Sequence, residues 1–473
     1  MTTAYDEVAY PSHPFAQTHP DRLACHAMLF GLPCAAVETC RVLDIGAGDG
    51  SNLIPMAASH PRARFVGFDL SQEAVKRGAA MIAALGLTNI EMVVGDILSA
   101  DFGAGAFDYV IAHGIYSWTP ELVRDGLLAS IRRHLAPHGV AFVSYNALPG
   151  GRIRQALRDR LLFAVRGVEG AAARAEAAHA HLLALIDGFS KDDPFQVLLL
   201  IEAQRLTERS LEVLAHDELS DTYYPLHFHE FRDHAERHAL QFMTGAESSR
   251  CGEGFAPPYA LDDPLFDVLA HVQELDFKDF RFFRQDLLVH GDVKLSRVPR
   301  PERLLAMHVS SSATRNEAGA LQVGASQINV TEPVLAAALE TAAGVRPATV
   351  PVSSVIKDAE HAAAFLRMYW IGAVDLYAAP STFPTRAGDR PTASPFARLQ
   401  AARGQTLLTT LNHGMVEVKD TFSLKFIAGL DGSRTRDQIA RDIAPVLGGT
   451  IEAVTAQMDS QLTLLAQMPL LVG

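Results

Sequence analysis

The feature that most limits the fold is a glycine-rich turn placed directly after a short apolar run, in the segment Val42-Leu-Asp-Ile-Gly-Ala-Gly-Asp-Gly50. The run Arg41–Ile45 has the length of one buried strand. Glycines at alternate positions let the backbone turn sharply and approach a ligand closely. A helix that begins after such a turn directs the positive end of its dipole toward that ligand. We therefore expect a strand, a turn and a helix with a small-molecule site at the turn.

Four more apolar runs follow, separated by helical patterns such as those over residues 71–85 and 120–135. The runs are Arg64–Phe68, Ile90–Val94, Phe107–Ile111 and Val140–Ser144. Buried runs that alternate with helices predict βαβ units and a parallel sheet covered by helices on both faces. Ala136–Gly139 is expected to form a turn before the last run. The predicted fold class is therefore α/β.

The spacing of the glycines separates two classes of cofactor that use such a turn. The dinucleotide fingerprint requires G-x-G-x-x-G, whereas Gly46, Gly48 and Gly50 form G-x-G-x-G. Asp44 lies two residues before the first glycine, where a carboxylate would repel a pyrophosphate and attract a positive group. S-adenosylmethionine (SAM) carries a sulfonium and an amino group, so the motif favours SAM, with S-adenosylhomocysteine (SAH) as product.

Two further acids support this interpretation. Asp69 ends the second predicted strand, where a carboxylate can accept hydrogen bonds from both ribose hydroxyls, and Asp96 ends the third, close to the expected adenine. The residues expected to contact the cofactor are Tyr10, Asp44, Gly46, Ala47, Gly48, Asp69, Leu70, Asp96, Ile97 and His113.

Segments along most of the chain resemble one family of bacterial methyltransferases. They are Tyr10–Arg22, the glycine turn, Phe68–Ser71, Ala112–Pro120, Val143–Gly150, His216–Ser220, Phe228–Leu240, Phe283–His290 and Leu411–Gly414. The chain is similar there to class I SAM-dependent methyltransferases that carry a methyltransferase regulatory domain, a family that includes lysine methyltransferases acting on outer-membrane proteins. The resemblance implies a protein substrate and a homodimer. One departure is Gly151, where the resemblance leads us to expect an aromatic residue.

Five segments are expected. Residues 1–151 form a Rossmann-like class I methyltransferase domain with an N-terminal lid, and 152–219 are an Ala- and Leu-rich helical insertion, expected to dimerise. Residues 220–260 complete the sheet. Residues 261–385 form a middle regulatory domain, and 386–473 form a C-terminal domain. These last two are expected to be small α/β units that resemble winged helices.

The candidate catalytic residues are His113, Tyr116 and Trp118, which follow the fourth predicted strand at the edge where ligands bind in parallel sheets. An equally good interpretation is that Tyr116 and Trp118 pack the start of the next helix. The N-terminal segment 5–22 is rich in aromatic residues, histidines and prolines. It is expected to cover the cofactor with Tyr5, Tyr10 and His13, or else to be a strap on the domain's flank.

Composition and short motifs limit the possible partners, location and metal content of the protein. The formal net charge of -13 argues against a nucleic-acid partner, and the acidic start Met1–Glu7 is not expected to act as a secretory signal. No apolar stretch is long enough for a membrane span, and the four cysteines suit a reducing cytoplasm. No metal is expected. His234 and His238 are four positions apart, as zinc ligands can be, but the run His234-Ala-Glu-Arg-His238 lacks the Glu directly after the first His that zinc proteases require, and solvated histidines are expected instead.

Three functions stay open at this point. The favoured one is transfer of methyl groups to protein lysine. A small-molecule N- or O-methyltransferase and a SAM-binding regulatory protein without turnover are the alternatives.

Overall fold

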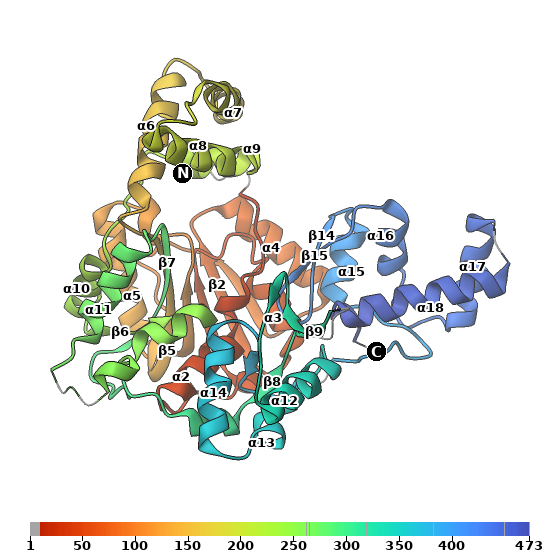
Figure 1. Cartoon of the computed structure of the whole chain (residues 1–473). Coiled ribbons are helices and arrows are strands. Elements are labelled where there is room, and N and C mark those ends of the chain that lie inside the picture. The colour runs from red at the N-terminus through yellow and green to blue at the C-terminus, as the bar shows by residue number, and fades with distance from the viewer. Residues whose placement is uncertain are drawn as a thin grey trace.

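The computed structural model describes residues 10–472, except 262, 264, 317–319, 382 and 449. Its centre is a seven-stranded sheet in the order β3-β2-β1-β4-β5-β7-β6 (Figure 1). The strands are β1 (Arg41–Ile45), β2 (Arg64–Asp69), β3 (Ile90–Val94), β4 (Phe107–Ala112), β5 (Leu135–Asn146), β6 (Leu240–Gly245) and β7 (Phe283–His290). The first five are parallel, and β7 runs antiparallel to both β5 and β6. This arrangement confirms the predicted Rossmann-like α/β class.

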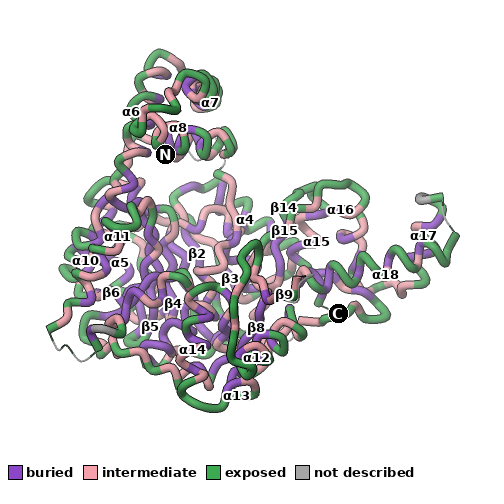
Figure 2. The backbone as a smooth tube through the Cα atoms, viewed as in Figure 1, coloured by how far each residue is buried: buried purple, intermediate pink, exposed green. Residues whose placement is uncertain are grey.

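The parallel strands are apolar at successive positions because helices cover both faces of the sheet. Val42 and Leu43 on β1 are both fully buried, but they belong to separate cores on opposite faces. The helices that pack on the parallel strands in the first core include α2 (Pro20–Leu29), α3 (Leu53–Ser59) and α4 (Gln72–Leu85). Those of the second core are α5 (Glu121–His134), α10 (Phe228–Arg237) and α11 (Val268–Lys278). Figure 2 shows the resulting buried centre.

Two expectations about the sheet need correction. Ala136–Gly139 is not a separate turn, because β5 starts at Leu135 and these residues form an irregularity where the register with β4 shifts. The sheet also does not end near residue 260. Strand β7 lies between β5 and β6, so part of the segment assigned to the middle domain builds the sheet.

The expected helical insertion projects away from the sheet (Figure 1). It contains α6 (Gly151–Ala164), α7 (Ala171–Gly188), α8 (Pro194–Thr207), α9 (Leu211–Val213) and a π-helical turn (Leu214–Glu218). Leucines such as Leu161 and Leu182 form its own small core. At its base, a Cβ on Gly151 would lie 2.8 Å from the Pro225 Cβ, so this chain has no room for the aromatic residue expected there.

The middle region packs beneath the sheet and joins the first core. It contains α12 (Pro333–Gly344), α13 (Val352–Val355) and α14 (Ala359–Trp370). Its two small sheets have the orders β12-β8-β13 and β11-β10-β9. Their strands are β8 (His308–Ser310), β9 (Thr314–Arg315), β10 (Leu321–Val323), β11 (Ser326–Gln327), β12 (Val350–Pro351) and β13 (Asp375–Tyr377). The Asp21 carboxylate at the start of α2 accepts the N–H groups of Ala378 and Ala379, at 2.9 and 3.1 Å, and so ties this region to the N-terminal helix.

The C-terminal region forms a separate core beside the sheet (Figure 1). Its elements are α15 (Pro395–Ala402), β14 (Leu407–Thr409), β15 (Met415–Glu417), α16 (Thr421–Ala428), α17 (Arg436–Leu447) and α18 (Ile451–Gln467). Strands β14 and β15 form an antiparallel hairpin. In the part of the chain that the structure describes, none of the helices is both long and apolar enough to cross a membrane.

Candidate functional site

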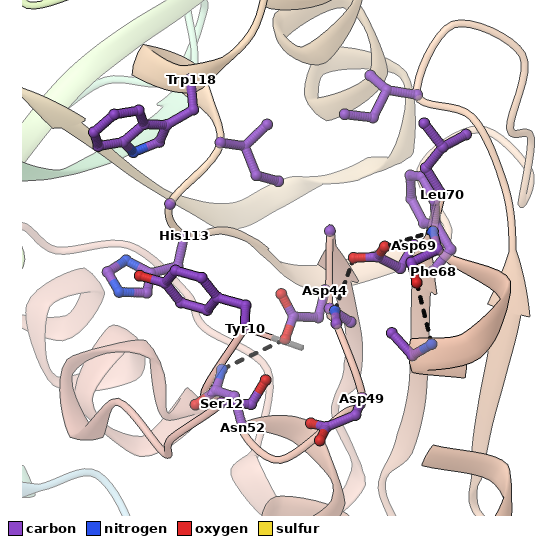
Figure 3. Close-up of a pocket in the computed structure, with 18 of the residues that line it drawn as sticks. Tyr10, Ser12, Asp44, Asp49, Asn52, Phe68, Asp69, Leu70, His113 and Trp118 are labelled. Carbon is purple, nitrogen blue, oxygen red and sulfur yellow. Dashed lines mark hydrogen bonds between the residues drawn. The ribbon is translucent and has the colours of Figure 1, made fainter. Parts of the chain in front are cut away.

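A cavity of about 470 Å³ opens where the parallel strands end (Figure 3). Phe68 and Leu70, from the end of β2, lie on one side of it, and His113 and Trp118, which follow β4, lie on the other. Its lining also includes Tyr10, Pro11, Ser12, His13, Phe15, Asp44, Gly46, Ala47, Gly48, Asp49, Asn52, Asp69, Arg77, Asp96, Ile97, Val123 and Asp217. All ten residues expected to contact a cofactor line this single cavity. Whether each of them binds it stays a prediction.

The glycine turn forms the floor of the cavity. Gly46 and Gly48 have φ angles of 69° and 56°, a left-handed conformation that other residues rarely adopt. A Cβ at Gly46 would also collide with the Ile115 side chain. The N–H groups of Gly46 and Ala47 donate to the Phe68 carbonyl at 2.9 and 3.0 Å, which fixes the turn against β2. The sequence pattern thus places backbone, rather than side chains, beside a ligand.

Asp69 is held in place by the backbone around it. Its Oδ2 accepts the Gly48 N–H at 2.9 Å and its Oδ1 accepts the Ser71 N–H at 2.8 Å. A carboxylate offers about four lone-pair sites, so it can accept more than two hydrogen bonds at once. Asp96, at the end of β3, is exposed, and its Oδ1 accepts the Leu98 N–H at 2.9 Å. Two oriented carboxylates therefore stand at neighbouring strand ends, as predicted.

Asp44 is the most deeply buried acid of the site, at 4% exposure. The Asn52 amide donates to its Oδ2 at 3.4 Å. Burial raises the pKa of the Asp44 carboxyl to about 7, the Asn52 hydrogen bond lowers it, and the neighbouring Asp69 raises it further. A buried carboxyl whose charged neighbour is another acid favours a bound cation, because a cation would stabilise its ionised form.

The three candidate catalytic residues have different surroundings. His113 lines the cavity, and its Nδ1 lies 2.8 Å from the Ser144 hydroxyl. Burial lowers the pKa of His113 to about 4, so its imidazole is neutral at pH 7. Trp118 also lines the cavity and packs on the Tyr223 ring, with the centroids 5.4 Å apart. Both are placed to contact a bound molecule.

Tyr116 does not line the cavity, so its catalytic role stays a prediction that its position does not support. It is 1% exposed, and its hydroxyl lies 2.6 Å from Nδ1 of His234 on α10. The reason is the short 3-10 turn Tyr116–Trp118, which directs the two aromatic rings to opposite sides. The alternative interpretation, that Tyr116 packs beside the next helix, is the one that its contacts support.

His234 and His238 also differ from the expectation of solvated histidines. His234 is 7% exposed and bonded to Tyr116. The Nε2 atoms of His234 and His238 lie 3.3 and 2.8 Å from Asp125 Oδ1. These three groups lie close enough together to hold a metal ion, but only if their mutual hydrogen bonds are broken.

The expected N-terminal lid lies against the cavity over the residues that the structure describes. Tyr10 and His13 line the cavity, whereas Tyr5 lies outside the described residues. The Phe15 N–H donates to Asn52 Oδ1 at 2.9 Å. The Phe15 ring packs edge-on against His113, with the centroids 3.9 Å apart. The segment therefore lies over the site rather than on a distant flank.

Asn52 and Asp217 are among the polar residues of the cavity lining that sequence reasoning missed. Asn52 follows the glycine turn by two residues, and a polar side chain at the start of an otherwise apolar helix was its signal. Asp217 comes from the π-helical turn at the end of the insertion. Only the resemblance over His216–Ser220 pointed to that turn, because nothing in its local pattern links it to the cavity.

Three family models match parts of the chain. They are a methyltransferase domain over residues 42–139, a predicted methyltransferase regulatory domain over residues 210–290, and the C-terminal winged helix domain of PKMT over residues 389–457. The last one places a winged helix in the C-terminal region, as predicted.

Similar proteins agree with these models. Protein RP028 of Rickettsia prowazekii is 30% identical over 51% of this chain and 96% of its own length. The chain belongs to the class I SAM-dependent methyltransferases with a methyltransferase regulatory domain. Protein RP789 of the same organism is 36% identical over 62% of this chain, but the match spans only 54% of RP789.

A solved member of this group shows the same fold. The structure of PKMT2 from Rickettsia typhi covers 98% of this chain and 100% of that protein, with a TM-score of 0.85 and 23% identity. PKMT2 has also been solved in complex with AdoHcy. The architecture of this methyltransferase chain, from the sheet to the winged helix, is therefore that of PKMT2.

Proposed function

We propose that this methyltransferase uses SAM to methylate lysine side chains of a protein substrate. Bound SAM supplies an electrophilic methyl group on a sulfonium and leaves as SAH. The residues present fit such a molecule. Asp69 would accept hydrogen bonds from the ribose hydroxyls, Asp44 would hold the amino group, and Asp96 with Ile97 would border the adenine. The AdoHcy complex of PKMT2 supports this assignment of the cavity.

The observation that carries the lysine proposal is the composition of the cavity wall beyond His113. Trp118 supplies an aromatic surface there, and Asp217 supplies a carboxylate from the helical insertion. An alkylammonium group is attracted both to an aromatic face and to a carboxylate. A neutral carboxylate-free pocket would instead suit an apolar or hydroxyl acceptor. The wall therefore favours an amine as methyl acceptor.

Methyl transfer from SAM requires the protein mainly to position the acceptor nitrogen against the methyl group. The acceptor ammonium must first lose a proton, and its nitrogen lone pair then forms the new bond to carbon while the carbon–sulfur bond breaks. Burial raises the pKa of Asp217, while Arg154 and Arg209, whose nitrogens lie 3.3 and 3.1 Å from its Oδ2, lower it. A positioned carboxylate of this kind can pass the ammonium proton to solvent.

Labelled SAM and a lysate from the organism of origin test the proposal. We expect label in protein and methyl-lysine after hydrolysis, and no label with an Asp69→Ala control. An Asp217→Asn variant keeps the shape of the wall and should raise KM for the protein acceptor without changing affinity for SAH. Label confined to small metabolites would support the small-molecule alternative. Tight SAH binding without any transfer would support the regulatory one.

We also propose that the helical insertion forms a homodimer. Phe195, Leu198 and Ile201 on α8 are 78%, 45% and 58% exposed and recur at helical spacing. An exposed apolar stripe of this kind is typical of an interface. Light scattering at micromolar concentration should give twice the chain mass, and Ile201→Glu should give one chain mass. A dimer that survives Ile201→Glu with Leu198→Glu would place the interface elsewhere.

A cytoplasmic location is part of the proposal and is supported by the four free cysteines.

A further inference from the structure

His413 lies in the tip of the β14–β15 hairpin, in the C-terminal winged-helix region. It is 2% exposed and has a φ angle of 64°, a conformation that is unfavourable for a residue other than glycine. The turn around it is closed by two hydrogen bonds. Gly414 N–H donates to Thr410 Oγ1 at 2.9 Å, and Thr410 N–H donates to the Gly414 carbonyl at 3.0 Å. A strained, buried and tightly closed turn presents this one imidazole to the methyltransferase domain.

The imidazole makes a hydrogen bond across the domain boundary. His413 Nε2 lies 2.9 Å from Oδ1 of Asn52, a residue 361 positions earlier that lines the SAM cavity. Burial, followed by the nearby His60, lowers the pKa of His413 to about 3. The imidazole is therefore neutral. Since Asn52 Oδ1 can only accept, the proton of the neutral ring lies on Nε2.

Asn52 connects His413 to the cavity through further hydrogen bonds. Its Oδ1 also accepts the Phe15 N–H at 2.9 Å, and its Nδ2 donates to Asp44 Oδ2 at 3.4 Å. The same amide thus orients the buried carboxylate on the cavity floor and the N-terminal segment that covers the cavity (Figure 3). Turning this amide would remove a donor from Asp44 and an acceptor from Phe15 together.

The packing around this bond is continuous. Helix α15 of the C-terminal region contacts α3 and α4, the two helices that follow β1 and β2. Phe396 on α15 is 2% exposed and belongs to the core that those helices share. The ring centroids of His19, at the start of α2, and His413 lie 5.3 Å apart. The C-terminal region is therefore seated against the back of the SAM site.

We propose that His413 is a positioning residue for the SAM site and acts through Asn52, so that cofactor binding and docking of the C-terminal winged helix stabilise each other. The proposal rests on SAM as the cofactor of the proposed function. Because linkage is reciprocal, a bond that improves the bound site must also be strengthened by binding. It also means that a residue far downstream of every predicted cofactor motif affects the SAM site.

Calorimetry of SAH binding to the full chain tests the proposal. His413→Ala removes the donor and should weaken binding about five- to tenfold, the effect of losing one buried hydrogen bond. His413→Gln can place an amide N–H at the position of Nε2 and should restore most of the affinity. His60→Gln is the matched control, because His60 belongs to the same histidine cluster and makes no hydrogen bond to Asn52 among the described contacts.

A double-mutant cycle separates action through Asn52 from general damage. The His413→Ala effect on the SAH Kd should largely disappear in an Asn52→Ala background, whereas a general loss of structure would add to it. Equal SAH affinity in wild type and His413→Ala, or an undiminished effect in the Asn52→Ala background, would overturn the proposal. An absence of SAH binding in the wild type would instead refute the proposed cofactor.

Hydrogen exchange on the unmodified chain provides the second test, which stands even if the variants fold poorly. Saturation with SAH should slow amide exchange in residues 410–414, and leave the exposed tip of the α7–α8 insertion unchanged. Unchanged exchange in residues 410–414, with SAH bound, would also overturn the proposal.

Discussion

The two halves of the central sheet both bury carboxylates, but they surround them differently. In the parallel half, Asp44 ends β1 at the cavity, and no arginine or lysine pairs with it within the described part of the chain. In the antiparallel half, Asp286 on β7 and Asp276 on α11 both bond the fully buried Arg284, at 2.9 and 2.6 Å. Asp44 at the cofactor edge is thus left for a ligand to compensate, whereas the acids around Arg284 inside the framework are compensated by the protein itself.

The arginine-centred cluster contains more than one pair. Glu253 lies 3.3 Å from Arg284 and 2.8 Å from Arg281, and the Tyr145 hydroxyl donates to Asp286 at 2.6 Å. The cluster joins β5, β7, α11 and the segment after β6, which are the elements that close the sheet. Removing its central cation would leave Asp286 without a cationic partner and weaken the compensation of Asp276 and Glu253, so it should matter for folding and not for the ligand.

The largest effect is therefore expected from Arg284→Met. The substitution leaves buried Asp286 without a cationic partner and removes one from Asp276 and Glu253, so it should lower the free energy of unfolding by about 3–5 kcal/mol. Urea denaturation measures it. Arg41→Met is the matched control, because Arg41 and its partner Asp108 are partly exposed, and this loss should be much smaller. A loss no greater than that of Arg41→Met would remove the distinction between the two halves of the sheet.

At the cavity edge of the parallel strands, we expect a substitution to reduce ligand affinity and to change stability little. Asp69→Ala should weaken SAH binding by about 1.5–3 kcal/mol, the range for hydrogen bonds to a charged group, because the paired ribose contacts are lost. Calorimetry gives the affinity, and thermal unfolding should show only a minor change. Glu91→Ala is the control, since Glu91 is exposed on β3 and does not line the cavity. Unchanged affinity in Asp69→Ala would contradict the assignment of Asp69.

The contrast also explains what the sequence could predict. Strands β1 to β4 were located closely, because parallel strands buried on both faces are continuous apolar runs. Strand β7 was not recognised, because Arg284, Gln285 and Asp286 interrupt its apolar pattern. These polar residues are tolerated only because partners from α11 and residue 253 meet them, and such partners cannot be inferred from local sequence.

The site residues also fall into two groups, those that the sequence revealed and those that it did not. Asp44, Asp69 and the glycines form a local motif whose spacing reports its chemistry, so they were found. Asp217 reaches the cavity from the insertion, and His413 contacts the cavity residue Asn52 from the C-terminal region, and no local pattern records either approach. Tyr116 and Trp118 are two positions apart, and their opposite orientations depend on a 3-10 turn that the sequence did not reveal.

Asp44 should make cofactor binding depend on pH. Burial raises the pKa of this carboxyl to about 7, so below that pH the free site carries a proton that a bound ammonium group must displace. Affinity for SAH should therefore increase with pH, by about five- to tenfold between about pH 6 and 8, and level off above the pKa. Calorimetry in matched buffers measures it. Asp44→Asn should bind SAH weakly at every pH, and an equally steep pH dependence in that variant would exclude Asp44 as its source.

The smallest effect on stability and activity is expected for a substitution at Tyr116, which tests how far the acceptor side of the cavity wall extends. Its hydroxyl meets His234 Nδ1 on the side away from the cavity, so Tyr116→Phe should lower stability by about 0.5–1.5 kcal/mol and leave kcat and KM unchanged. Trp118→Leu is the comparison, because Trp118 faces the cavity and its loss should raise KM for the acceptor while SAH affinity stays the same. Denaturation and steady-state kinetics on the two variants provide the measurement. A fall in kcat for Tyr116→Phe with normal stability would mean that the hydroxyl takes part in the reaction. The cavity wall would then have to extend through the 3-10 turn to α10, and the separation between the ligand edge and the framework would fail at that point.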